Sequence, residues 1–404
     1  MTHDIIHTPI SAEELALQRK RFSHLSDDEF RFMIQQVDGR QRTRDKLPTF
    51  SNIDDWWYPV RISCEQCSSE ATAKYKASLL PSTHYTLVDL TGGYGVDTFF
   101  MSKNASIAHY VERNEELCKI VAHNFSKYCS NIHIHNTDAI NYLQNMQLVD
   151  IIYIDPARRN QHGGKVFRLE ECEPNVIELL PILRSKSKQI IIKLSPMLDI
   201  TQAIQALDGN WDVHVVALKN EVKEILLVSC IDRYHPDTTL NEYHKHTDGM
   251  VYAINLSSNI SAENINSFIF SRREELNTQI QLYNSSQQHI LTIGSYIYEP
   301  NAAIIKAGAY KLVAKRYELF KLSQNTHLYI SDKLIQDFPG RIWRIISTDI
   351  KKQPDIRANI MTRNYPLSPE QLRKKLKVKD SDTQTIIGAR IIEKPTLLLA
   401  ERIN

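Results

Sequence analysis

Four acidic side chains stand where predicted apolar strands end, and together they could hold the polar groups of a nucleoside. They are Asp89, Glu112, Asp138 and Asp155, which end or follow the predicted strands 85–90, 107–111, 132–135 and 149–154. Ligands of open parallel sheets bind beyond the carboxyl ends of the strands, where a carboxylate about 20 residues after a glycine turn accepts hydrogen bonds from ribose. One such residue alone would be a helix N-cap or a solvated loop residue. Four in succession predict a shared site at one edge of a sheet.

A glycine cluster follows the first of these strands, in the segment Asp89-Leu90-Thr91-Gly92-Gly93-Tyr94-Gly95. Glycines at a strand-to-helix turn let a ligand approach the backbone because no Cβ intervenes. The spacing differs from the G-x-G-x-x-G pattern of dinucleotide-binding turns. It resembles motif I of class I S-adenosylmethionine (SAM) methyltransferases, which implies SAM as the cofactor.

The resemblance also implies a role for each residue of the predicted site. Gly92, Gly93 and Gly95 would admit the methionine end of SAM, and Asp89 would shape the turn in which Thr91 also contacts the cofactor. Glu112 would hold the ribose, while Asp138 and Ala139 would contact the adenine.

The fourth strand is followed by Asp155-Pro156-Ala157-Arg158-Arg159, where the acceptor would bind. In base-amino methyltransferases the corresponding Asp-Pro-Pro-Tyr holds an exocyclic amine and stacks the base on the aromatic ring. Ala157 and Arg158 depart from that pattern, so the stacking ring is missing. We expect Asp155, Pro156 and Arg158 to face the acceptor, with Asp155 also beside the cofactor. Arg158 or Arg159 could hold a phosphate or a carbonyl of the substrate, or form an ion pair within the loop.

The Asp-Pro-x-Arg sequence also resembles pyrimidine C5 methyltransferases, which need a nucleophilic cysteine after the next strand. That place reads Lys193-Leu194-Ser195-Pro196-Met197, without a cysteine. The sequence therefore argues against a covalent cysteine intermediate.

The elements that must position these residues alternate strand and helix over residues 85–232, as a parallel sheet requires. Two further strands, 212–218 and 224–231, are joined by a short turn and must be antiparallel. Such a hairpin is typical of class I methyltransferases and disfavours a nicotinamide oxidoreductase. The fold class is thus α/β, a Rossmann-like sheet after a helical region over 1–84. We expect a small α+β domain over 233–337, with helices over 261–283 and from 298, and a basic domain over 338–404.

Composition sets outer bounds on function. The 404 residues carry a net charge of +2 and are 42% hydrophobic, which is ordinary for a globular protein. No stretch reaches the ~20 apolar residues of a membrane span. Six cysteines in so long a chain do not form a disulfide framework, and the histidines show no metal-ligand spacing. We expect a cytoplasmic protein with no metal.

Positive charge is concentrated near the end of the nearly neutral chain. A predicted helix over 369–377 carries Arg373, Lys374, Lys375 and Lys377. A local excess of this kind fits a polyanion such as RNA, although a solvated helix face is the alternative.

Taken together, the chain resembles bacterial class I SAM-dependent methyltransferases that carry a C-terminal THUMP-like domain. The resemblance is carried by segments 65–77, 89–98, 155–160, 298–303 and 338–341. It implies a ferredoxin-like middle domain, a THUMP-like terminal domain and, because THUMP domains bind RNA, a tRNA or rRNA substrate. In related enzymes the helix before the first strand closes over the cofactor, so Ser69, Glu70 and Thr72 would reach SAM or the target. A small-molecule or protein methyltransferase and a non-catalytic, SAM-sensing RNA-binding protein remain alternatives.

Overall fold

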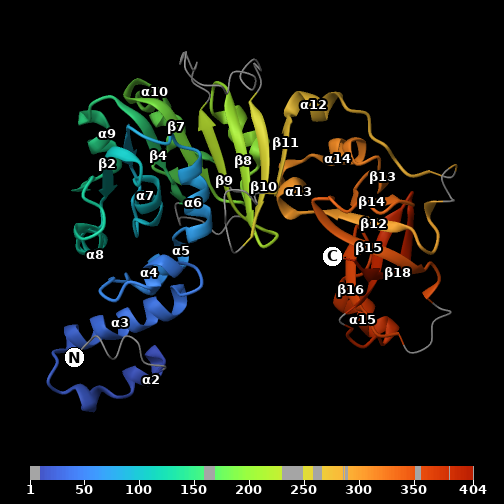
Figure 1. Cartoon of the computed structure of the whole chain (residues 1–404), viewed down its shortest axis with the longest axis horizontal. Coiled ribbons are helices and arrows are strands. Elements are labelled where there is room, and N and C mark those ends of the chain that lie inside the picture. The colour runs from blue at the N-terminus through green and yellow to red at the C-terminus, as the bar shows by residue number, and fades with distance from the viewer. Residues whose placement is uncertain are drawn as a thin grey trace. The chain divides into compact units, whose positions relative to one another are not determined.

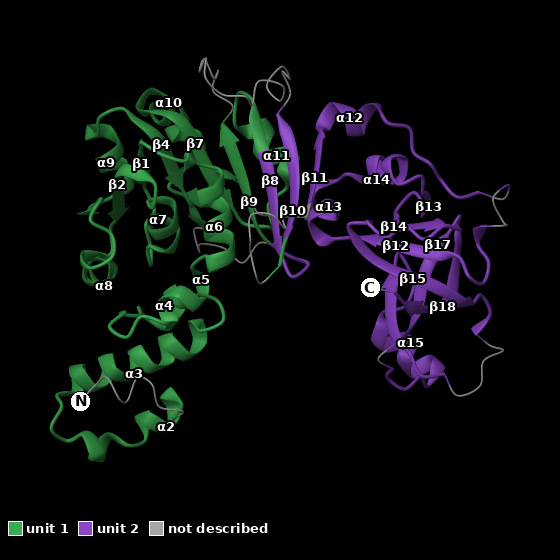
Figure 2. Ribbon diagram, viewed as in Figure 1, with its two compact units in different colours: residues 1–212, 223–241, 256–261 green, residues 213–222, 242–255, 262–404 purple. Residues whose placement is uncertain are grey.

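The computed structural model describes residues 10–158, 169–229, 249–257, 266–284, 286, 290–350, 356–381 and 383–403 (Figure 1). The chain divides into two compact units (Figure 2). Unit 1 comprises residues 1–212, 223–241 and 256–261, and unit 2 comprises 213–222, 242–255 and 262–404.

The described part of unit 1 begins with a series of helices, as the sequence predicts. They are α2 (Ala12–Ala16), η1 (Arg19–Phe22), α3 (Asp27–Thr43), α4 (Pro48–Ser51), α5 (Arg61–Gln66) and α6 (Glu70–Ser78). Capping boxes start α2 and α3, where Ser11 pairs with Glu14 and Ser26 with Glu29. α6 begins after Ser69, whose hydroxyl accepts the backbone N–H of Thr72.

A sheet with intervening helices forms the rest of unit 1. Its elements are β1 (Tyr85–Asp89), α7 (Val96–Met101), β2 (Ala105–Glu112), α8 (Glu115–Ser126), β3 (Ile132–Asn136), α9 (Ala139–Asn145), β4 (Val149–Ile154), α10 (Val176–Lys186), β7 (Ser187–Leu194), α11 (Ile200–Ala206) and β9 (Glu221–Ser229). The strand order is β9-β7-β4-β1-β2-β3, and only β9 runs antiparallel. The order reverses between β1 and β4, which creates the crevice where ligands of such sheets bind.

A short ladder follows β4. β5 (Ala157–Arg158) pairs antiparallel with β6 (Cys172–Glu173), just after η2 (Leu169–Glu171). Two residues separate β8 (Trp211–Leu218) from β9, so the predicted short connection is present. The antiparallel pairing of β9 with β7 confirms that the parallel sheet continues into an antiparallel strand.

Unit 2 contains β8, two further strands beside it and a seven-stranded sheet. The elements after β8 are β10 (Met250–Leu256), β11 (Asn266–Ser271), α12 (Arg272–Asn277), β12 (Tyr296–Pro300), α13 (Ala302–Ala307), α14 (Tyr310–Arg316), β13 (Phe320–Ser323), β14 (Thr326–Ser331), β15 (Gly340–Ser347), β16 (Asn359–Arg363), α15 (Pro369–Leu376), β17 (Gln384–Ile391) and β18 (Lys394–Arg402). The seven-stranded sheet has the order β13-β14-β12-β15-β18-β17-β16. The predicted α/β class with C-terminal α+β parts is confirmed.

Two predicted helices of unit 2 differ from the structure in their extent. The described part of 261–283 contains β11 and the short α12, because Phe268 and Phe270 alternate inward while β11 pairs with β10. Tyr298 does not begin a helix but lies inside β12. Helix α13 starts only at Ala302, where the Asn301 side chain accepts the N–H of Ile304.

The segments 298–303 and 338–341 meet in unit 2. Glu299, which is buried, lies 2.6 Å from Arg363 and 3.6 Å from Arg341. A Cβ on Gly340 would lie 2.0 Å from the carbonyl oxygen of Glu299. These residues therefore hold strands β12, β15 and β16 together.

Candidate functional site

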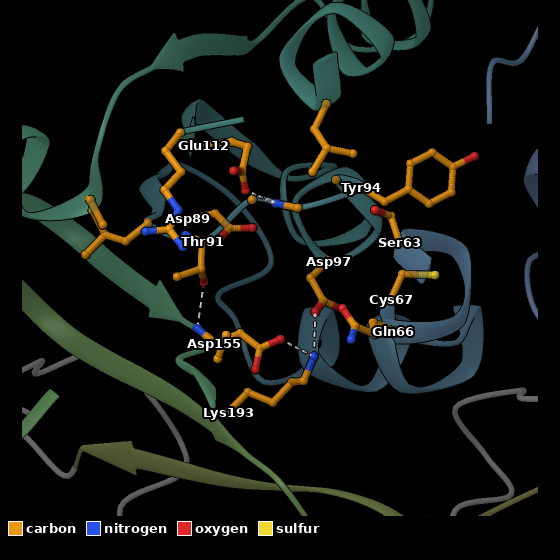
Figure 3. Close-up of a pocket in the computed structure, with 18 of the residues that line it drawn as sticks. Ser63, Gln66, Cys67, Asp89, Thr91, Tyr94, Asp97, Glu112, Asp155 and Lys193 are labelled. Carbon is orange, nitrogen blue, oxygen red and sulfur yellow. Dashed lines mark hydrogen bonds and ion pairs between the residues drawn. The ribbon is translucent and has the colours of Figure 1, made fainter. Parts of the chain in front are cut away.

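A cavity of about 320 Å³ opens in unit 1 beyond the carboxyl ends of β1, β2, β4 and β7 (Figure 3). This volume is at the small end of the range for ligand sites. The cavity brings together all nine residues predicted to contact the cofactor: Asp89, Thr91, Gly92, Gly93, Gly95, Glu112, Asp138, Ala139 and Asp155. Residues from before the sheet complete one wall, among them Ser63, Gln66, Cys67 and Ser68.

The N–H groups of the three glycines are used within the protein, and the missing Cβ of Gly92 makes room for a neighbouring ring. The N–H groups of Gly92, Gly93 and Gly95 already donate to Val111 O, Glu112 Oε2 and Gly92 O, respectively. A Cβ on Gly92 would lie 2.2 Å from the Tyr110 ring, and Gly95 adopts a left-handed φ of +79°. Since a pyrophosphate needs free N–H groups and tolerates few carboxylates, this turn is poorly suited to a dinucleotide.

Asp89 holds the glycine turn in place through two hydrogen bonds. Its buried carboxylate accepts the Thr98 hydroxyl at 2.6 Å and the N–H of Thr91 at 3.0 Å. Burial raises the pKa of Asp89 to about 7, against an ordinary value near 3.8, although these hydrogen bonds oppose the shift. The sequence-based role of Asp89, to fix the turn, agrees with this geometry.

Glu112 and Asp138 both use their carboxylates to hold the backbone around the cavity. Glu112 accepts the N–H of Gly93 at 3.0 Å and the N–H of Asn114 at 2.8 Å, one with each oxygen. Asp138 caps α9 by accepting the N–H of Ile140 at 2.8 Å. A carboxylate oxygen has more than one lone pair, so each side chain can also accept a hydrogen bond from a ligand.

Asp155 lies at the end of β4, held on two sides. Its N–H donates to the Thr91 hydroxyl at 2.7 Å, and its Oδ2 lies 2.5 Å from the ammonium of Lys193 at the end of β7. Lys193 is not among the residues predicted from the sequence. A lysine inside the otherwise apolar Ile190-Ile191-Ile192-Lys193-Leu194 was the available signal, because a buried cation needs a partner.

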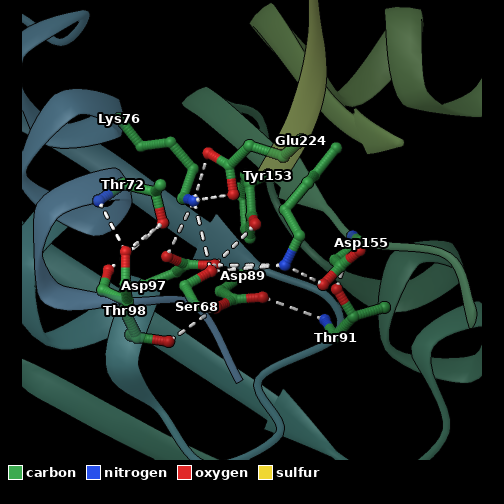
Figure 4. A network of polar contacts seen from close by, with 12 residues as sticks. Ser68, Thr72, Lys76, Asp89, Thr91, Asp97, Thr98, Tyr153, Asp155 and Glu224 are labelled. Carbon is green, nitrogen blue, oxygen red and sulfur yellow. Dashed lines mark hydrogen bonds and ion pairs between the residues drawn. The ribbon is translucent and has the colours of Figure 1, made fainter. Parts of the chain in front are cut away.

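A buried polar network continues from Lys193 (Figure 4). Asp97 Oδ2 accepts the Ser68 hydroxyl and the Tyr153 hydroxyl, both at 2.7 Å, and Lys76 Nζ lies 3.2 Å from Asp97 Oδ1. Burial disfavours the ionised form of Asp97, but the two lysines and these hydrogen bonds keep its pKa below its ordinary value. Burial lowers the pKa of Lys193, yet the surrounding carboxylates more than reverse this and raise it.

Several predicted residues do not line the cavity. Ser69 caps α6, Thr72 is buried beside it, and Glu70 accepts the backbone N–H and hydroxyl of Thr49 and pairs with Lys74. Their neighbour Ser68 takes the place expected of them.

The other predicted acceptor and substrate residues lie apart from the described lining. Pro156 and Arg158 follow Asp155 along the chain without lining the cavity, and Arg158 is in β5. Arg159 lies outside the described residues. Arg373, Lys374 and Lys375 lie on α15 in unit 2, and Lys377 ends that helix.

No helix of the described chain is long and apolar enough to cross a membrane. Within the same residues, no group of three or more histidine, cysteine and acidic side chains is arranged to hold a metal ion.

Comparisons with known proteins agree with this architecture. Residues 296–339 match a family model described as a ferredoxin-like domain, and residues 340–402 match a THUMP domain-like model. Two uncharacterized SAM-dependent methyltransferases of Mycobacterium tuberculosis, from strains CDC 1551 / Oshkosh and ATCC 25618 / H37Rv, are 20% identical over 251 residues. These matches span 60% of this chain and 60% of each relative.

The crystal structure of a protein from Porphyromonas gingivalis W83, assigned as a methyltransferase, matches along the whole length. It is 31% identical, covers 100% of this chain and 98% of its own, and superimposes with a TM-score of 0.81. The chain therefore belongs to the family of SAM-dependent methyltransferases that carry ferredoxin-like and THUMP-like domains at the C-terminus.

Proposed function

We propose that this protein transfers a methyl group from SAM to a base of RNA, in tRNA or rRNA, without a covalent cysteine intermediate. The observation that carries the proposal is the shared cavity: the predicted cofactor residues and the acceptor residue Asp155 line one space of about 320 Å³.

The charge of the cavity fits SAM, which when bound supplies a methyl group on a positively charged sulfur. The acidic lining residues are Asp89, Asp97, Glu112, Asp138, Asp155 and Glu173, and the basic ones are Arg113 and Lys193. Both basic side chains are paired, Arg113 with Glu173 at 2.9 Å and Lys193 with Asp155 at 2.5 Å. Asp97 is paired with Lys76 at 3.2 Å, and burial raises the pKa of Asp89 to about 7. The negative charge of Glu112 and Asp138 attracts a cation and disfavours a phosphorylated cofactor.

The residues around Asp155 support direct transfer. Asp155 is 35% exposed and faces the cavity, so its carboxylate can accept a proton or a hydrogen bond from an acceptor. The end of β7 reads Lys193-Leu194, so no cysteine stands where a covalent mechanism would need one. The cysteine among the lining residues, Cys67, lies before α6, and burial raises the pKa of its thiol, which disfavours the reactive thiolate.

The RNA part of the proposal rests on the THUMP-like region and its charge. Arg357, Lys375, Lys377 and Lys379 line a second cavity in unit 2, of about 1190 Å³. Lysines grouped in this way suit a phosphate backbone.

The cysteines of the described residues are unpaired, which supports the proposed cytoplasmic location.

The proposal is tested by SAM binding and methyl incorporation. Calorimetry should show that Glu112→Ala weakens SAM binding by roughly tenfold or more, equivalent to about 1.4 kcal/mol. Glu116→Ala, a change of an exposed residue on α8, should leave the affinity unchanged. With total RNA from cells lacking the protein, labelled SAM should yield label that ribonuclease removes. SAM binding without incorporation would contradict the proposal and favour a SAM sensor, and incorporation that resists ribonuclease would favour a protein or small-molecule methyltransferase.

A further inference from the structure

The ammonium group of Lys193 has one N–H donor left for a ligand in the cavity. An ammonium carries three N–H donors. One faces Asp155 Oδ2 at 2.5 Å and a second faces the Ser68 hydroxyl at 3.3 Å. Asp97 Oδ2 is 3.8 Å away, which is beyond hydrogen-bond distance. Within the described residues, a third N–H therefore remains for a ligand, and Lys193 lines the cavity with 14% of its side chain exposed.

Asp155 presents a matching acceptor beside this donor. Oδ2 pairs with Lys193, whereas Oδ1 receives no hydrogen bond from the described part of the chain. The end of the cavity at β4 and β7 thus offers one carboxylate oxygen and one cationic N–H side by side (Figure 3).

We propose that Asp155 and Lys193 together select a base that carries a ring N–H next to a carbonyl, that is guanine or uracil, and direct the methyl group to that ring nitrogen. This inference rests on the proposed function and specifies its substrate class. Lys193 would donate to the base carbonyl, and Asp155 would accept the ring N–H.

Charge rather than hydrogen-bond pattern makes the distinction. The amino edge of adenine or cytosine also presents a donor beside an acceptor, so it could pair with both residues. An exocyclic amine, however, becomes positively charged as it attacks the methyl group, and an adjacent ammonium opposes that charge. A ring nitrogen that gives up its proton leaves negative charge on the neighbouring carbonyl oxygen, and the Lys193 ammonium stabilises it.

The step balances within the proposed reaction. The ring N–H bond breaks and its proton passes to the Asp155 carboxylate, from which it is later released to solvent. The nitrogen electron pair forms the new N–CH3 bond while the S–CH3 bond of SAM breaks. The sulfur keeps that bonding pair and becomes a neutral thioether. No further reactant is required.

Identification of the labelled nucleoside tests the inference directly. RNA labelled by the full-length protein would be digested to nucleosides and separated against methylated standards. We expect label in 1-methylguanosine or 3-methyluridine. Label in a methylated adenosine or cytidine, at an exocyclic nitrogen, at carbon or on the ribose would overturn the inference and leave RNA methylation standing. Absence of label in RNA would instead overturn the proposed function, and the inference with it.

Variants of Lys193 provide a second test. Lys193→Met should lower the methyl-transfer rate by about 100-fold or more while the SAM affinity stays within a few-fold. Alkaline pH should restore part of that loss, because the ring proton then leaves without help, whereas a structural defect would not recover. Lys193→Arg retains a cationic donor and should keep much of the activity if Met destabilises the fold. Lys188→Met, on the same strand but outside the cavity, is the matched control. Full activity in folded Lys193→Met would overturn the inference.

Discussion

Lys76 on α6 and Glu224 on β9 form a fully buried ion pair, with the ammonium 2.6 and 2.7 Å from the two carboxylate oxygens. The side chains are 0% and 3% exposed. The same ammonium lies 3.2 Å from Asp97 and donates to the Ser68 hydroxyl at 3.2 Å. The pair therefore joins the helix before the sheet to the wall of the cavity, through residues far apart in the sequence.

Replacement of Lys76 by methionine should destabilise the protein strongly. It leaves Glu224 charged and buried without its partner, which typically costs about 3–5 kcal/mol. The free energy of unfolding in urea measures this. Lys74→Met is the control, because Lys74 is 44% exposed and its ion pair with Glu70 should contribute about 1 kcal/mol or less. If both variants lost the same free energy of unfolding, the buried ion pair would contribute no more to stability than the exposed one.

Gly92→Ala should damage both stability and cofactor binding. The new Cβ would lie 2.2 Å from the Tyr110 ring, whose hydroxyl donates to the carbonyl of Gly93 at 2.5 Å. Overpacking of this kind costs about 1–3 kcal/mol and displaces the turn. Thermal unfolding and SAM titration measure the two effects. In Gly93→Ala the nearest atom is 3.9 Å away, so only the strain of its φ of +54° should be felt. An unchanged SAM affinity in Gly92→Ala would argue that the turn does not border the cofactor.

The sequence predicted the parallel sheet and the glycine turn because both depend on local patterns. β1 and β4 are mostly apolar, and the acidic residues that line the cavity end or follow the four strands β1 to β4. It could not predict the pairing of Lys193 with Asp155 or of Lys76 with Glu224, since these contacts join strands and helices distant along the chain. The helix predicted to start at Tyr298 is wrong there for the same reason. Pro300 near a helical pattern suggests a helix start, but the pairing of β12 with β14 and β15 holds this backbone extended.

The pH dependence of stability should report the buried carboxyl of Asp89. Its pKa is raised to about 7 in the folded protein, against about 3.8 when unfolded. Between these values the folded state retains a proton that the unfolded state has released, so this contribution to stability falls as the pH rises from 4 to 7 and is level above 7. Asp89→Asn cannot ionise. As the pH rises from 4 to 7, the unfolding free energy of wild type should therefore fall relative to that of Asp89→Asn. A difference independent of pH would contradict the assignment.

RNA affinity should depend on Lys374 more than on its neighbour Arg373. Arg373 already lies 2.6 Å from Asp380, whereas Lys374 is exposed on α15. Lys374→Ala should weaken tRNA binding and reduce the slope of log affinity against log salt by about one. Arg373→Ala should change the slope less. Fluorescence anisotropy at several salt concentrations gives both values, and unchanged binding in Lys374→Ala would place the RNA elsewhere.

The proposed function requires Asp155 to act on the acceptor in the cavity that would hold SAM. Single-turnover transfer of labelled methyl groups from prebound SAM to RNA measures this step, with Asp155→Ala compared with wild type and with Asp150→Ala. Asp150 lies on the same strand, outside the cavity, and pairs with Lys188 at 2.7 Å. We expect Asp155→Ala to bind SAM with near wild-type affinity and to lose about 100-fold or more in rate, while Asp150→Ala keeps its rate. Equal rates for Asp155→Ala and wild type would contradict the account.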